Sequence, residues 1–209
     1  MNTIPTALDH LVLATPDLAA TIADFTERTG VAPAVGGVHV GLGTRNYLVA
    51  LGGTGYLEII GPDPEQAHHD GPRPFGVEGL TGPRTATWAI RTTDLDAAAV
   101  DAARARGYDP GPAHPMSRRT PDGTLLEWRL TGPAHPCGLV PFLIDWGTSA
   151  HPTASGLPTT PLLEVSATTP EPEKIHRVLT ALGTELALTE GPEGMTFTLD
   201  TPRGPVTFD

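Results

Sequence analysis

The sequence predicts an α+β fold in which one β-α-β-β-β module occurs more than once. Residues 7–30 and 85–111 share a plan of an apolar strand, a turn containing Thr and Asp, an alanine-rich helix and a glycine. Glycine and proline number 24 and 23 among 209 residues, which favours short strands joined by tight turns. A chain of this length can bury a substantial core.

The helices of this plan have recognisable ends. Leu18, Ile22 and Phe25 follow helical spacing in the first copy. A Thr/Asp start precedes each helix, and Gly30 and Gly107 follow the two helices. Glycine suits a left-handed helix cap because it has no Cβ atom.

Three candidate strands follow each helix, separated by glycine-rich or Pro-Asp-Gly turns. They cover residues 37–41, 46–53 and 55–61 in the first copy and 113–119, 124–130 and 139–147 in the second. We expect a first module over residues 1–80, a second over 81–150, a linker over 151–161 and a third, smaller βαβββ-like module over 162–209. The first two modules are expected to pair into one cup-shaped mixed sheet, with the third packed outside it or on a second chain.

Composition narrows the choice of partners. The net charge of −11 and the pI near 5.0 argue against nucleic acid and anionic membranes, and leave a small-molecule ligand as the expected partner. The single cysteine, Cys137, excludes an internal disulfide and suits a reducing compartment. The sequence shows neither a signal segment nor a long apolar span, so we expect a cytoplasmic protein. A homodimer is one assembly that we expect it could form.

Strand alternation singles out a histidine and a carboxylate. His10 lies in the first apolar strand, and Glu58 lies between Leu57 and Ile59 in a later one. A buried carboxylate is costly unless it is paired with another group or bound to a cation. We therefore expect His10 and Glu58 to face each other.

These segments resemble the vicinal oxygen chelate superfamily of glyoxalase, bleomycin-resistance and extradiol dioxygenase proteins, and in particular its glyoxalase-like domain branch. The motifs that carry the resemblance are LDHLVLATPDL at 8–18 and GYLEIIGPD at 55–63, with weaker echoes in TWAIRTTDL and PFLIDWG. The resemblance implies a cup-shaped sheet whose first-strand histidine and last-strand glutamate bind a divalent metal. His10 and Glu58 occupy those positions.

A histidine and a carboxylate together suit Zn, Ni, Mn or Fe(II). The second module is expected to supply further ligands, but alignment of the helix starts places Thr87, a poor ligand, opposite His10. Alignment of the trailing glycines places Ile144 opposite Glu58, with Asp145 one residue away. A shift of one residue turns a strand side chain to the other face, so Asp145 is a third candidate ligand whose orientation depends on register.

Other polar and aromatic residues are candidates for binding a ligand. His39 and Asn46 lie in a glycine-rich stretch that lets a ligand approach the backbone, although such residues are often only solvated. Arg118 is either a clamp for an anionic group or an exposed strand residue. Trp128 and Trp146 form either walls of the cup or ordinary core.

Two functions follow from these expectations. The first is a metal-dependent lyase or isomerase acting on a small oxygenated substrate, with Glu58 as both metal ligand and proton carrier. The alternative is a metal-free protein that binds and sequesters a small molecule, which Thr87 favours because it removes a ligand.

Overall fold

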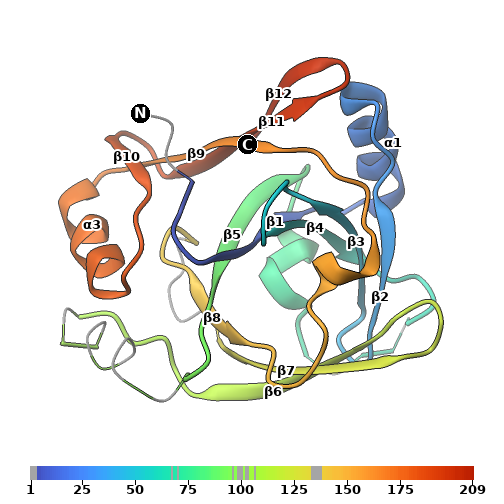
Figure 1. The fold of residues 1–209 in the computed structure, drawn as a ribbon, viewed down its shortest axis with the longest axis horizontal. Coiled ribbons are helices and arrows are strands. Elements are labelled where there is room, and N and C mark those ends of the chain that lie inside the picture. Colours follow the sequence, from blue (N-terminus) through green and yellow to red (C-terminus); the bar gives the residue numbers. More distant parts are fainter. Residues whose placement is uncertain are drawn as a thin grey trace.

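The computed structural model is a closed eight-stranded barrel with a four-stranded sheet beside it (Figure 1). It describes residues 4–66, 68–69, 71–95, 97, 101, 104–105, 107–132 and 138–209. Most of the helix expected before Gly107 lies outside the described residues, as does Cys137. The sheet-rich α+β fold that the sequence predicts is confirmed.

The barrel consists of two four-stranded halves in the order β1-β4-β3-β2-β6-β7-β8-β5. Its strands are β1 (Leu8–Ala14), β2 (Ala34–His39), β3 (Thr44–Ala50), β4 (Tyr56–Pro62), β5 (Arg84–Arg91), β6 (Ala113–Arg119), β7 (Leu125–Thr131) and β8 (Phe142–Asp145). In each half the first strand runs parallel to the last, β1 with β4 and β5 with β8. β1 pairs with β5 and β2 pairs with β6, so the expected cup is in fact a closed ring.

The second sheet has a different pairing. Its elements are β9 (Leu162–Thr169), α3 (Pro172–Ala181), β10 (Ala187–Glu190), β11 (Gly194–Thr201) and β12 (Gly204–Phe208). β9 pairs in parallel with β10, the strand directly after the helix, and antiparallel with β11. A barrel half instead pairs its first strand with its last. The same order of elements therefore gives another topology, because α3 returns the chain directly beside β9.

Helix α1 (Leu18–Thr29) has the ends that the sequence predicts. The Asp17 side chain accepts a hydrogen bond from the Ala20 N–H at 3.0 Å. Gly30 ends the helix at φ 75° and donates its N–H to the Thr26 carbonyl. Phe25 is fully buried, so the apolar side of α1 packs against the protein.

Strand alternation divides the core into two clusters. On β4, Leu57 and Ile59 belong to the cluster outside the barrel, together with Phe25 of α1. Tyr56 and Ile60 belong to the cluster inside the barrel. Glu58 lies two residues from both Tyr56 and Ile60 along β4, and strand alternation therefore turns it toward the interior as well.

The expected linker is packed against the barrel. It contains the short 3-10 helix η2 (Pro152–Ser155), and a second one, η1 (Pro74–Gly79), follows β4. The Ala50 N–H donates to the Pro158 carbonyl at 2.8 Å, and the Thr160 N–H donates to the Ala50 carbonyl at 2.9 Å. Among the described residues, no helix is long and apolar enough to cross a membrane.

Phe208 connects the second sheet to α1, since its ring stacks on Phe25 at 5.1 Å and on Phe197 at 5.2 Å. We expect Phe208→Ala to lower the free energy of unfolding by about 3–5 kcal/mol, because a buried aromatic ring is lost. Urea denaturation measures the change. Leu125→Ala, at a side chain that is 42% exposed, should change it by less than about 0.5 kcal/mol. Similar losses in both variants would contradict the packing described.

Candidate functional site

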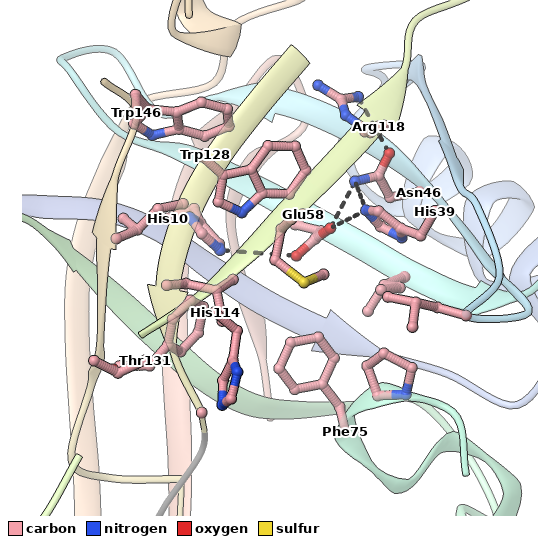
Figure 2. Close-up of a pocket in the computed structure, with 18 of the residues that line it drawn as sticks. His10, His39, Asn46, Glu58, Phe75, His114, Arg118, Trp128, Thr131 and Trp146 are labelled. Atoms are coloured by element: carbon pink, nitrogen blue, oxygen red, sulfur yellow. Dashed lines mark hydrogen bonds and ion pairs between the residues drawn. The ribbon is translucent and has the colours of Figure 1, made fainter. Parts of the chain in front are cut away.

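The barrel contains a cavity of about 330 Å³ that is partly open to solvent (Figure 2). The sequence-predicted residues that line it are His10, His39, Asn46, Glu58, Arg118, Trp128 and Trp146. Asp145 is not among the lining residues. The structure therefore brings together seven of the eight candidates, from strands far apart in the sequence.

Glu58 is the acidic residue of this cavity and is almost completely buried. Its Oε1 accepts a hydrogen bond from the Asn46 side-chain amide at 2.6 Å and lies 3.8 Å from His39 Nε2. Its Oε2 lies 3.8 Å from His10 Nε2 and accepts no hydrogen bond from any described residue. The two carboxylate oxygens are thus distinct, one held by an amide and one free.

His10 is oriented by its neighbour in sequence. Its Nδ1 lies 2.8 Å from Asp9 Oδ1. Burial by itself raises the pKa of Asp9, but hydrogen bonds from His10, His151 and Arg91 hold that pKa well below its ordinary range. An ionised carboxylate only accepts hydrogen bonds, so His10 Nδ1 carries a hydrogen and Nε2 faces Glu58.

Asp9 has further partners, although no local pattern in the sequence points to it. Its Oδ2 accepts hydrogen bonds from Arg91 Nε at 2.8 Å and from Trp146 Nε1 at 3.1 Å, and lies 3.3 Å from His151 Nε2. Trp146 is therefore a hydrogen-bonded member of the site as well as a wall. The pairing of β1 with β5 is irregular between Leu8 and His10, and such a bulge redirects the extra residue, here Asp9.

His39 completes the polar end of the cavity. Its Nδ1 lies 3.1 Å from Thr44 Oγ1, and its Nε2 lies 3.4 Å from the Asn46 amide nitrogen. Burial lowers the pKa of His39, and this effect outweighs the opposing charge of Glu58. His39 is therefore a neutral imidazole at pH 7.

Arg118 is a buried cation, only 3% exposed, that contacts Asn46. Its Nη1 donates to Asn46 Oδ1 at 3.4 Å, which turns the Asn46 amide nitrogen toward Glu58. A Cβ atom at Gly36 would lie 2.2 Å from Asn46 Oδ1 and 2.6 Å from Arg118 Nη1. Glycine is required at position 36 for these two side chains to meet.

Strand β8 of the second half supplies apolar groups at the position where a metal site would need a ligand, although His114 of β6 also lines the cavity. Phe142 and Ile144 of β8 line the cavity, and Asp145 instead accepts a hydrogen bond from the Gly147 N–H. This corrects the assignment of Asp145 as a ligand, because the register turns Ile144 inward. Among the described residues, no group of three or more His, Cys, Asp or Glu side chains is placed to hold a metal ion. His10 and Glu58 are suitable donors, but the arrangement does not fit the metal centre that the resemblance implies.

The fold and cavity define a closed β-barrel whose interior cavity is lined by one carboxylate and three imidazoles, and those of His10 and His39 lie 3.8 Å from the carboxylate. The model of the glyoxalase-like domain family matches residues 8–183. The chain therefore belongs to that family, within the vicinal oxygen chelate superfamily, and the resemblance seen in the sequence is confirmed. No curated protein matches the sequence significantly.

Several solved structures are similar to this chain. A hypothetical protein from Staphylococcus aureus is 14% identical, with a TM-score of 0.65 and coverage of 99% of both chains. A methylmalonyl-CoA epimerase from Mycobacterium tuberculosis is 20% identical over 75% of this chain and 95% of that one, with a TM-score of 0.44. The Streptomyces coelicolor methylmalonyl-CoA epimerase in complex with 2-nitronate-propionyl-CoA is 22% identical over 69% and 100%, with a TM-score of 0.46. The first of these shows that the architecture extends over the whole chain.

We expect Asp9→Asn to lower the free energy of unfolding by about 3 kcal/mol, because an amide cannot satisfy all the donors that now converge on one buried carboxylate. Urea denaturation at pH 7 measures the loss. Asp24→Asn is the matched control, since Asp24 is an exposed acid in an i,i+4 pair with Arg28 and should contribute less than about 0.5 kcal/mol. Equal effects of the two changes would show that Asp9 has no special role.

The lowered pKa of His39 predicts a dependence of stability on pH. Between this lowered pKa and the ordinary value of 6.5, the unfolded chain binds more protons than the folded one. The free energy of unfolding should therefore fall as the pH drops below about 6.5, by at most about 1.4 kcal/mol per pH unit from this residue. Urea denaturation at pH 7.5 and 5.5 should show a smaller decrease in His39→Asn than in the wild type. The same decrease in both proteins would refute the assignment.

Proposed function

We propose that the cavity binds a small carbonyl compound and that Glu58 accepts a proton from the carbon next to the carbonyl group. This is chemistry of the isomerase or lyase type. The observation that carries the proposal is the free Oε2 of a buried carboxylate whose other oxygen is held by Asn46. Such a base is oriented before the substrate arrives.

The steps conserve atoms and electrons. The C–H bond next to the carbonyl breaks, its proton moves to Glu58 Oε2, and its electron pair forms a carbon–carbon double bond. The carbonyl π electrons move to oxygen, which gives an enolate. Return of a proton from Glu58 to the same carbon re-forms the carbonyl group and leaves an exchanged hydrogen on that carbon.

The surroundings of Glu58 support this role. Asn46 is fixed by Arg118, and so Oε1 keeps its hydrogen bond while Oε2 reacts. His10 and His39 contribute nitrogen atoms on either side of the carboxylate. Apolar walls limit water near the base, and electrostatic interactions are stronger in such a site. Because the described residues form no group of three or more metal-ligating side chains, we assign the proton transfer to the protein groups and derive no step through a metal.

A second candidate is the metal-free binding protein. It is favoured by the apolar lining of the cavity, where aromatic and aliphatic side chains including Phe75, Met116 and Phe142 gather. A sequestering protein would hold its ligand on the same lining without moving a proton. The homodimer and the cytoplasmic location that the sequence suggests stay predictions.

We expect the wild-type protein to accelerate exchange of the benzylic hydrogens of phenylacetone or phenylpyruvate for deuterium in D₂O, followed by ¹H NMR. Glu58→Gln should slow this exchange by about 10²–10⁴-fold, the usual contribution of a general base. Glu127→Gln, at an exposed carboxylate of β7, is the control and should retain the rate. Binding without exchange in the wild type would favour the sequestering protein. A wild type that neither binds these ketones nor exchanges their hydrogens would overturn the proposal.

A further inference from the structure

The cavity wall holds a hydrogen-bond donor that has no acceptor among the described residues. Trp128 of β7 is 9% exposed and lines the cavity. Its Nε1 is buried and finds no acceptor among the residues that the structure describes. Native proteins pair nearly all their buried N–H groups, and an exception beside a cavity points to a ligand.

In the other two tryptophans, the indole N–H donates a hydrogen bond to a protein acceptor. Trp88 Nε1 donates to the Leu139 carbonyl at 2.8 Å. Trp146 Nε1 donates to Asp9 Oδ2 at 3.1 Å. Of the three indoles, only that of Trp128 lacks an acceptor among the described residues.

The Trp128 ring is held in one orientation close to the polar end of the cavity. It packs against the Trp146 ring with the centroids 5.1 Å apart and the planes at 38°. In Figure 2 the nitrogen edge of Trp128 is turned toward the line that joins His10 and Glu58. A ligand atom beside the free Oε2 of Glu58 would therefore lie on the donor side of this indole.

We propose that the Trp128 indole N–H donates a hydrogen bond to the carbonyl oxygen of the ligand and stabilises the negative charge that forms there when Glu58 removes the adjacent proton. The inference rests on the proposed function and names its ligand class. The ligand is an enolisable ketone or aldehyde whose oxygen faces Trp128, whose acidic C–H faces Glu58 and whose apolar substituent packs on the aromatic wall.

The net charge of the site does not change during this proton transfer. Glu58 becomes neutral as it accepts the proton, and the negative charge moves to the ligand oxygen. Trp128 stays neutral and supplies only a fixed dipole, which is the usual way in which a protein stabilises an oxyanion. Trp128 thus acts on the ligand oxygen, whereas Glu58 Oε2 acts on the ligand C–H group.

Trp128→Phe tests the inference because it keeps an aromatic ring and removes the donor. With phenylacetone as the probe, we expect exchange in D₂O to slow by about 10²–10³-fold, as for loss of one oxyanion donor. Calorimetry should show that binding of phenylacetone weakens about tenfold, whereas binding of propylbenzene, which has no oxygen, stays the same. The thermal midpoint should fall less than in Trp88→Phe, since the lost Trp128 N–H has no acceptor among the described residues.

Trp88→Phe is the matched control. It removes an indole N–H that is bonded and lies outside the cavity, so the thermal midpoint should fall while the exchange rate of the folded protein is retained. If the wild type exchanges phenylacetone and Trp128→Phe does so equally well, this inference fails and the proposed function stands. If the wild type binds phenylacetone without exchange, an equal affinity of Trp128→Phe overturns the inference. A wild type that neither binds nor exchanges phenylacetone overturns both proposals.

Discussion

The site depends on one buried carboxylate, that of Asp9, which no solvent reaches. It bonds His10 within its own strand, Arg91 on β5 and Trp146 after β8, and it lies 3.3 Å from His151 Nε2 at the start of η2. Burying this charge is tolerable only because several donors converge on it. The same contacts fix the orientation of His10 and hold the segment after β8 against the barrel. Local stability and the geometry of the site therefore have a common origin.

The two barrel halves share a strand pairing but contribute different chemistry. The first half supplies the polar end of the cavity, through His10, His39, Asn46 and Glu58. The second half supplies mostly apolar wall, through side chains such as Phe142 and Ile144, together with the Arg118 guanidinium that orients Asn46. One face of a bound molecule would thus meet ionisable groups while the other meets aromatic rings. This asymmetry suits a reaction that places charge on one atom of an otherwise apolar ligand.

Local patterns in the sequence predicted much of this arrangement, and long-range pairing explains what they missed. Alternation along β4 and the apolar neighbours of Glu58 were sufficient to turn Glu58 inward, and the end signals of α1 were sufficient to place that helix. Asp9 was missed because alternation assumes a regular strand, whereas β1 is irregular at that residue. The register of β8, and with it the outward position of Asp145, depends on pairing with β5 and β7. The pairing of the second sheet likewise depends on where α3 returns the chain, which the order of elements does not specify.

The central claim is that protein groups alone, with Glu58 as the base, make up the reactive end of this cavity. Elemental analysis of untagged protein, purified without chelators and then incubated with Zn, Ni, Mn or Fe(II), tests it most directly beside His10→Ala and Glu58→Ala. The account predicts that bound metal stays well below one ion per chain and does not differ between the wild type and the two variants. One ion per wild-type chain, lost in both variants, would contradict the account and establish the metal centre that the family resemblance implies.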